Sequence, residues 1–282
     1  MSFHKNNKTM VSRNLFVGGI LISMVLILTN CENMRCIKGN DNITTEEVDD
    51  IDTFDKIYVE ADYEVLITQD TVTKVSILAD DNLIPYITIE VAGGELILTT
   101  ANDRCLRSKN DIRVYVSSPL ITRLEVEGSG DIFVNDITLN DSLAENAFEV
   151  ISEGSGNIDF SSVFCDELII DLVGSGDIYF SDVDVLNTID VLSDGSGDII
   201  FQGGIGDVGI YTVEGSGNIE ADRVELTEAD VKNYGSGDIY VWAIEILFAE
   251  TNASGNIYYR QLPIRTYNFK ENGTGLILPL PN

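Results

Sequence analysis

Apolar and polar residues alternate along most of the chain after residue 50. Around one glycine-rich motif, Leu168, Ile170 and Leu172 stand before it, and Ile178 and Phe180 stand after it. Because successive side chains of a β-strand point to opposite faces, this spacing of two predicts strands with one buried face. The same spacing recurs around other copies of the motif. We therefore expect a strand on each side of every copy.

The motif is Gly-Ser-Gly followed by Asp or Asn and then Ile, and it recurs at a nearly constant spacing. Eight copies or variants follow one another at offsets of 26, 20, 21, 20, 20, 18 and 20 residues. A fixed period in this range is typical of solenoids, in which each repeat is one coil that buries its apolar face against its neighbours. Six copies begin at Gly128, Gly154, Gly174, Gly195, Gly215 and Gly235, and two variants begin at Ala253 and Gly273.

Each copy places two glycines around a serine between two predicted strands. Glycine has no Cβ and takes positive φ values at little cost, so the chain can reverse sharply there. The sequence therefore predicts a turn at each Gly-Ser-Gly. The predicted turn glycines are Gly128, Gly130, Gly154, Gly156, Gly174, Gly176, Gly195, Gly197, Gly215, Gly217, Gly235 and Gly237.

If every coil turns at the same point, equivalent residues stack about 4.8 Å apart along the axis. Crossovers between parallel strands are right-handed as a rule, and the hexapeptide repeat of left-handed β-helices is absent. We therefore expect an all-β fold, a right-handed parallel β-helix (β-solenoid) with coils of about 20 residues. Its inner column of core residues comprises Ile132, Ile158, Ile178, Ile199, Ile219, Ile239 and Ile257.

Residues 51–120 lack the motif but keep the alternation in short runs. We expect this N-terminal β segment to cap one end of the coils, since an exposed end strand invites pairing with another chain. At the other end, Pro279 and Pro281 lack the amide that would extend the ladder. The predicted organisation is a signal peptide at 1–30, an acidic tether at 31–50, the capping β segment at 51–120 and the Gly-Ser-Gly β-helix at 121–282.

The first 30 residues have the layout of a secretory signal. Three basic residues precede an apolar run at 15–28, and no acid interrupts it. The sequence Leu28-Thr29-Asn30-Cys31 resembles a bacterial lipoprotein signal, so Cys31 is the predicted lipidation site. An ordinary signal peptide and an uncleaved membrane anchor are the alternatives. The lipoprotein interpretation, which we favour, predicts an exported outer membrane lipoprotein of the cell envelope. It would lie on the periplasmic face or the cell surface and be attached to the membrane by its N-terminal lipid.

Three further cysteines are Cys36, Cys105 and Cys165. Their number is odd and their spacing fits no metal site, so the sequence implies no disulfide framework. A bond between Cys36 and Cys105 is the alternative that the sequence leaves open.

The chain is strongly acidic. It carries 47 acids and 17 bases, a formal net charge of −30. Between Arg123 and Arg223 the sequence contains no Lys or Arg. Such a surface repels polyanions, so nucleic acid is excluded as a partner.

The sequence offers little for catalysis. Its only histidine is His4, inside the predicted signal, which removes Ser-His-Asp and Cys-His catalysis and histidine metal sites from the mature chain. Few bases remain in the repeats to serve a polysaccharide lyase. We therefore expect no catalytic residues. A β-helix carbohydrate-active enzyme, either hydrolase or lyase, is the alternative because acids are abundant.

The residue before the inner isoleucine is Asp or Asn in seven successive copies. We expect each side chain to hydrogen-bond the backbone of its own turn, as such residues commonly do, and no cofactor is expected. The alternative is Ca²⁺ held between Asp177 and Asp198, which are neighbours without an intervening Asn. The column comprises Asp131, Asn157, Asp177, Asp198, Asn218, Asp238 and Asn256.

Aromatic residues gather in the last coils. Tyr240, Trp242, Tyr258 and Tyr259 are candidates for contact with a ligand, since aromatic side chains stack on sugars and are enriched at protein interfaces. The alternative is that several of them fill the core or cover the end of the coils.

Two stretches resemble the head GIN domain family of auto-transporter adhesins, which is common in exported proteins of Bacteroides-like bacteria. The first stretch lies within residues 54–83, and the second is the Gly-Ser-Gly series. Together the two cover about residues 50–282. The resemblance implies a β-helical superhelix with Gly-Ser-Gly turns, a role in adhesion, kinship with trimeric autotransporter adhesins and no known catalytic residues. The first stretch contains Phe54-Asp55-Lys56-Ile57-Tyr58-Val59, Val65-Leu66-Ile67-Thr68-Gln69 and Asp80-Asp81-Asn82-Leu83.

These observations predict a lipid-anchored, non-catalytic adhesion or interaction module with an acidic surface. Its expected partners are the membrane, an unknown glycan or protein surface, and copies of itself in a homotrimer. A purely structural envelope protein that self-associates is a further alternative.

Overall fold

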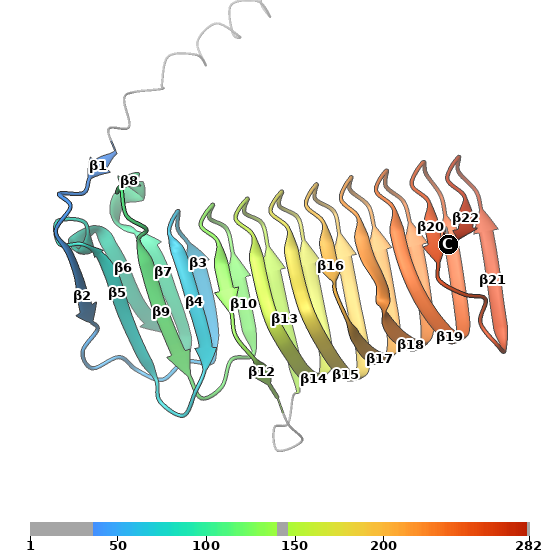
Figure 1. Ribbon diagram of the computed structural model, residues 1–282, viewed down its shortest axis with the longest axis horizontal. Coiled ribbons are helices and arrows are strands. Elements are labelled where there is room, and N and C mark those ends of the chain that lie inside the picture. Colours follow the sequence, from blue (N-terminus) through green and yellow to red (C-terminus); the bar gives the residue numbers. More distant parts are fainter. Residues whose placement is uncertain (1–35, 140–145, 281–282) are drawn as a thin grey trace, which may run out of the picture. The chain divides into compact units, whose positions relative to one another are not determined.

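The computed structural model describes residues 36–139 and 146–280. From Ile37 onwards, the described residues form one compact unit. The described chain is all-β, with two short 3-10 turns, η1 (Ile84–Tyr86) and η2 (Ala101–Asp103) (Figure 1). Among the described residues no helix is long and apolar enough to cross a membrane.

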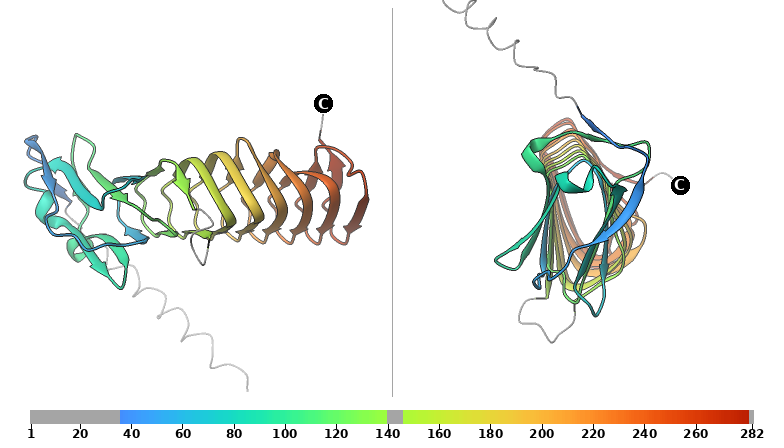
Figure 2. Two further views of the ribbon diagram at one scale, coloured as in Figure 1. Left: turned by 90° about the horizontal axis from the view of Figure 1, so that it is seen from below. Right: turned by 90° about the vertical axis from the view of Figure 1, so that its left-hand side faces the viewer.

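The repeats form coils whose strands pair in parallel, each with its equivalent one coil later. Ile158 pairs with Ile178, for example, and Leu172 pairs with Ser193. Viewed end-on, the coils superimpose around a common interior (Figure 2). The strands are β10 (Arg123–Val126), β11 (Ile132–Val134), β12 (Ile137–Thr138), β13 (Ala147–Ser152), β14 (Ile158–Leu172), β15 (Ile178–Ser193), β16 (Ile199–Phe201), β17 (Gly204–Val213), β18 (Ile219–Asn233), β19 (Ile239–Thr251), β20 (Ile257–Tyr259), β21 (Thr266–Glu271) and β22 (Ile277–Pro279).

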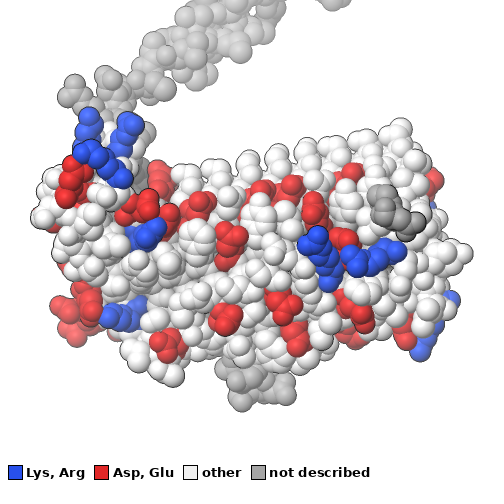
Figure 3. Space-filling model, in the orientation of Figure 1, with Lys and Arg blue, Asp and Glu red and all other residues white. Residues whose placement is uncertain are grey.

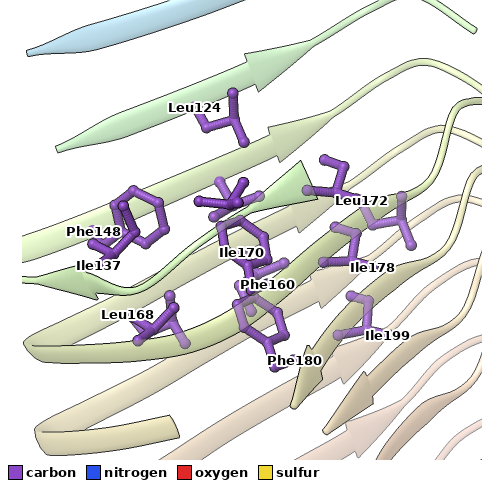
Figure 4. Close-up of a cluster of buried hydrophobic side chains, with 14 of the residues drawn as sticks. Leu124, Ile137, Phe148, Phe160, Leu168, Ile170, Leu172, Ile178, Phe180 and Ile199 are labelled. Carbon is purple, nitrogen blue, oxygen red and sulfur yellow. The ribbon is translucent and has the colours of Figure 1, made fainter. Parts of the chain in front are cut away.

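The motif isoleucines form the predicted inner column, which is confirmed. Ile178 pairs with Ile158 on one side and with Ile199 on the other, and all three are fully buried. Two residues further on, Phe160, Phe180 and Phe201 form a second column, with successive ring centroids 4.6 and 4.9 Å apart. Figure 4 shows Ile178 and Ile199 from the first column and Phe160 and Phe180 from the second within one cluster of buried side chains. Alternation along each strand and repetition between coils thus produce one continuous core.

Two strands that precede the repeats belong to the same parallel ladder. β3 (Lys56–Glu60) pairs with β10, and β4 (Glu64–Gln69) pairs with β11. On their other edges, β3 pairs with β7 (Glu95–Thr100) and β4 with β9 (Arg113–Ser118), again in parallel. Residues 56–69 are therefore in register with the first Gly-Ser-Gly coil.

Antiparallel strands follow beyond β7 and β9. β6 (Ile87–Ala92) pairs with β7, β5 (Lys74–Asp80) with β9, and β2 (Ile43–Glu47) with β5. A two-stranded ladder joins β1 (Ile37–Lys38) to β8 (Leu106–Arg107). The β1–β8 ladder is parallel and separate, and within the large sheet the direction of pairing changes from parallel to antiparallel at this end.

The Gly-Ser-Gly glycines are required for a different reason from the one predicted. Among the described residues, the glycines with positive φ are Gly93, Gly94 and Gly204, none of which belongs to a motif. A Cβ on Gly154 would instead lie 2.1 Å from the carbonyl oxygen of Gly128, one coil earlier. The expectation of left-handed backbone is therefore wrong, and the motif needs glycine because the stacked turns approach each other so closely.

The cysteines depart from the expectation of no disulfide framework. Cys36 and Cys105 are both disulfide-bonded, whereas Cys165 is a free and buried thiol. Burial raises the pKa of the Cys165 thiol to about 12. Sequence spacing could not distinguish these states, because contacts between residues far apart in sequence decide them.

Candidate functional site

The Asp or Asn of each motif belongs to a hydrogen-bond ladder that runs along the coils. Its side-chain Oδ1 accepts the backbone N–H of the equivalent residue one coil later, as when Asn157 donates to Asp131 at 2.9 Å. The expectation that each side chain bonds its own turn is wrong. The side chain reaches the next coil because stacked strands lie only about 4.8 Å apart. The donors that continue the ladder are Asp177, Asp198, Asn218, Asp238, Asn256 and finally Leu276.

The backbone contributes a second bond at the same junction. The Ile158 N–H donates to the carbonyl oxygen of Asp177 at 2.9 Å, and the Ile178 N–H donates to that of Asp198 at 2.9 Å. The Asx position of each motif therefore takes part in one backbone bond and one side-chain bond to the next coil, in addition to bonds between the Gly-Ser-Gly backbones such as that from the Ser175 N–H to the Gly154 carbonyl oxygen. Either Asp or Asn supplies the required acceptor oxygen.

The candidate calcium ligands Asp177 and Asp198 lie in neighbouring coils of this ladder. Asp177 accepts the Asp198 N–H through Oδ1 at 2.8 Å and the Tyr179 hydroxyl through Oδ2 at 2.8 Å. Asp198 Oδ1 accepts both the backbone and the side-chain N–H of Asn218. Within the described residues, no group of three or more His, Cys, Asp and Glu side chains could hold a metal ion. The expectation of no cofactor and the alternative of calcium at this pair would both be tested by a metal titration.

Three of the predicted ligand residues lie together on an outward face. Tyr240 is in register with Tyr258 in the next coil and with Glu220 in the preceding one. The Tyr240 and Tyr258 rings stack with centroids 5.0 Å apart and planes 16° apart. Because the rings cover each other's faces, their edges and hydroxyls are what they offer to a ligand.

Trp242 stands beside these tyrosines and is held by charged neighbours. The guanidinium of Arg260 lies 5.0 Å from the centroid of the Trp242 ring, a cation–π contact. Arg260 also donates to Asp222 at 3.0 Å. We call Glu220, Asp222, Tyr240, Trp242, Tyr258 and Arg260 the aromatic–arginine patch.

The fourth predicted ligand residue does not belong to this patch. Tyr259 packs against the hydrophobic core, and its ring centroid lies 5.2 Å from that of Phe269. Alternation along β20 places it on the opposite side from Tyr258. Tyr259 therefore follows the alternative of core filling, and the predicted set divides between surface and interior.

Burial and neighbouring acids shape the electrostatics of the patch. Partial burial raises the pKa of the Glu220 carboxyl, and Asp198 and Asp222 raise it further while Arg223 opposes them. Burial likewise raises the pKa of the Tyr240 hydroxyl. The patch thus combines a neutral phenol donor with carboxylates and a guanidinium, a set suited to hydrogen bonding with polar ligands.

Glu220, Asp222 and Arg260 were missed as site residues in the sequence. A signal did exist, because Glu220 stands 20 residues before Tyr240, as Asp222 does before Trp242. Arg260 stands only 18 residues after Trp242, where the coil is shorter. Aligning the outward positions of successive coils would have brought all three to the patch.

A polar hollow of about 250 Å³ lies beside the first turn of the ladder. Its lining includes Glu60, Asp62, Arg104 and Glu127. Small-molecule sites are usually mostly apolar, and this one is not. The predicted lipidation site Cys31 lies outside the described residues.

A family model described as "Putative auto-transporter adhesin, head GIN domain" matches residues 53–263. No protein with a curated description matches the chain.

Several solved structures share the fold. A "putative adhesin" from Parabacteroides merdae has a TM-score of 0.78 at 19% identity, over 87% of this chain and 99% of that one. A "putative adhesin" from Parabacteroides distasonis has a TM-score of 0.74 at 22% identity, over 86% and 99%. A "Putative lipid binding protein" from Parabacteroides distasonis has a TM-score of 0.73 at 26% identity, over 88% and 100%.

Proposed function

Because the chain belongs to the head GIN domain family of auto-transporter adhesins, we propose that it is an exported, non-catalytic adhesion module. In this proposal the coils form a right-handed parallel β-helix that presents an acidic surface. The parallel, in-register pairing of successive coils supports the β-helix, and the general preference for right-handed crossovers supports the hand.

The aromatic–arginine patch is the binding surface of the module. The observation that carries this assignment is Trp242, held by Arg260 across a cation–π contact while Arg260 bonds Asp222. A site held by contacts between rigid strands loses little entropy on binding, which favours recognition. Five residues of the patch lie on three successive strands, β18, β19 and β20, and Arg260 directly follows β20.

The ligand in this proposal is a glycan or a polar protein surface. The stacked rings of Tyr240 and Tyr258 leave edges and hydroxyls for contact, so hydrogen bonds contribute more than stacking on a sugar face. The module needs no cofactor for this. A lipid on Cys31 attaches it to the outer membrane, on the periplasmic face or the cell surface, and a homotrimer would present three patches for multivalent contact.

The test is a glycan and protein array probed with residues 36–282, which retain both disulfide-bonded cysteines. We expect binding without shortening of any polysaccharide, and loss of that binding in Trp242→Ala and Arg260→Ala. The matched control is Phe133→Ala. Phe133, on β11, is an exposed aromatic residue in the same outward column as Glu220 and Tyr240, several coils away from the patch.

Two results would contradict the proposal. Cleavage of a polysaccharide would replace adhesion with catalysis. Binding that survives Trp242→Ala, or fails in Phe133→Ala as well, would move the site away from the patch.

A further inference from the structure

A second surface stands out on the strand segments that precede each turn. Two outward columns run side by side there. Acidic and apolar residues alternate along the whole of the first column, and along the second column from Ile151 to Leu192. Over these coils the alternation is staggered, so an acid in one column lies beside an aliphatic residue in the other, as Asp171 lies beside Ile169 and Asp190 beside Leu192. We call this the checkerboard face. Its columns are Glu149, Ile169, Asp190, Ile210, Asp230 and Phe248, and Ile151, Asp171, Leu192, Thr212, Lys232 and Glu250.

The stagger has an electrostatic reason. Like charges in adjacent coils would lie about 4.8 Å apart, and in every second coil they lie about 9.6 Å apart. Doubling the distance halves the unscreened repulsion, and salt screens most of what remains. The cost is that each acid has aliphatic neighbours, which remove water from it.

The chain's own cations neutralise the acids at both ends of this face. Arg123 bonds Glu125 at 2.6 Å and Glu149 at 2.9 Å. Towards the other end, Lys232 bonds Asp230 at 2.9 Å. On the side shown in Figure 3, acids are spread along the whole length, and the fewer Lys and Arg residues lie in separate groups towards the left and to the right of centre.

The central acids have no such partner. Among the described residues, Asp171 Oδ1 is buried without any hydrogen-bond donor, and no Lys or Arg occurs in the sequence between Arg123 and Arg223. Asp171 is flanked in its column by Ile151 and Leu192. Such an orphaned acceptor is rare in a folded protein, because leaving it unpaired costs free energy.

Asp190 is the second central acid. It lies one coil later in the neighbouring column, between Ile169 and Ile210. Burial raises the carboxyl pKa of both aspartates, and for Asp171 the charges of Asp194 and Glu149 raise it further. Asp171 is half-buried and Asp190 is exposed, and both lie between aliphatic residues of neighbouring coils. An added cation would stabilise both carboxylates.

We propose that the centre of the checkerboard face binds a basic, partly apolar segment of a partner protein, with an Arg or Lys on Asp171 and Asp190. Apolar side chains of the same segment cover Ile169 and Leu192. This surface is separate from the aromatic–arginine patch and does not depend on it.

Charge complementarity identifies the occupant. A second copy of this chain would bring acids against acids, because the equivalent stretch of the copy also lacks Lys and Arg. A bare divalent cation requires more oxygen ligands than these two isolated carboxylates supply, and it would leave the aliphatic residues uncovered. A polypeptide supplies both the cation and the apolar cover.

The probe is a fluorescent peptide with the sequence Gly-Leu-Arg-Leu-Arg-Leu-Gly, titrated with residues 36–282 and followed by anisotropy. Its counterpart with Gln in place of Arg measures the contribution of charge. We expect Asp171→Asn combined with Asp190→Asn to weaken binding of the Arg peptide about tenfold or more. Leu192→Ser should also weaken it.

The matched control is Asp159→Asn. Asp159 is another partly buried acid with a pKa raised by burial, and it lies on β14 after the turn, outside the checkerboard face. It should change peptide affinity by no more than about twofold, as expected for general charge. Trp242→Ala should leave peptide binding unchanged, which keeps this test distinct from that of the adhesion site.

Three results would overturn the inference. Equal weakening by Asp159→Asn would reduce the binding to general attraction by an acidic protein. Equal binding of the Gln peptide would remove the role of the cation. If millimolar Ca²⁺ displaced the peptide and NaCl at the same ionic strength did not, the carboxylates would be assigned to a metal site instead.

Discussion

At the residue scale, the motif glycines are dictated by the contact between coils rather than by the backbone angles of one coil. A Cβ on Gly176 would lie 2.0 Å from the carbonyl oxygen of Gly156. The serine between the two glycines is exposed and has no such restriction, as Ser175 illustrates. One motif thus holds positions with opposite tolerance to substitution.

The glycine argument predicts that Gly176→Ala destabilises the protein by about 3 kcal/mol or more, because backbone in both coils must move to admit the methyl group. Ser175→Ala is the control and should stay within about 0.5 kcal/mol of the wild type. Urea unfolding followed by circular dichroism measures both. Equal stability of the two variants would show that the close approach does not constrain the turn.

Asp171 provides the second residue-scale prediction. Its carboxyl pKa is raised above the ordinary value of 3.8, so the folded state disfavours the charged form. The wild type therefore loses stability as pH rises from the unfolded pKa through the raised folded pKa, and the loss is complete above it. Asp171→Asn removes this loss, and we expect the variant to melt at a higher temperature at pH 7.

The same variant should show no advantage at a pH below both pKa values, where Asp171 is protonated in both states. Melting temperatures of both proteins measured from pH 3 to pH 8 test whether the advantage of the variant grows as the pH rises. Asp177→Asn is a useful comparison, because Asp177, unlike Asp171, has a hydrogen-bond donor on each of its two side-chain oxygens. A constant advantage of Asp171→Asn at every pH would point to packing instead of charge.

At the element scale, much of the ladder was predictable because it is periodic. Alternation gave the strands, and the 20-residue spacing placed Ile158, Ile178 and Ile199 in one buried column. The partner of each Asx side chain was not predictable, because the backbone N–H groups of its own turn are equally close donors for the side-chain oxygen. The separation of Tyr258 from Tyr259 did follow from alternation, once β20 was known to be a strand.

The side-chain ladder predicts how Asp198 contributes to stability. In Asp198→Ala, the backbone and side-chain N–H groups of Asn218 lose their shared acceptor, which should cost about 1–3 kcal/mol. Asp198→Asn keeps an acceptor oxygen and should cost far less. Denaturant midpoints, with unchanged slopes, measure the difference. If the alanine and asparagine variants were equally stable, the ladder would contribute little.

At the scale of the whole molecule, the chain combines a well-packed core with a large excess of negative charge. Its 47 acids against 17 bases mean that folding gathers like charges, which opposes the compact state. Its surface ion pairs, such as Lys74–Glu47, oppose this effect only locally. Salt therefore acts on two terms of opposite sign, since it weakens repulsion and ion pairs alike.

The excess of acids decides which term is larger, and we expect NaCl to stabilise the fold. Raising NaCl from about 20 mM to about 500 mM should increase the melting temperature by roughly 2–4 °C, corresponding to about 1 kcal/mol. The gain should shrink at pH 4, where many carboxylates are neutral. Binding of the Arg peptide should change in the opposite direction, because the same salt screens attraction between partners of unlike charge. A melting temperature that falls with NaCl would mean that ion pairs outweigh self-repulsion. The acids would then affect stability mainly through local ion pairs rather than through the net charge of the whole chain.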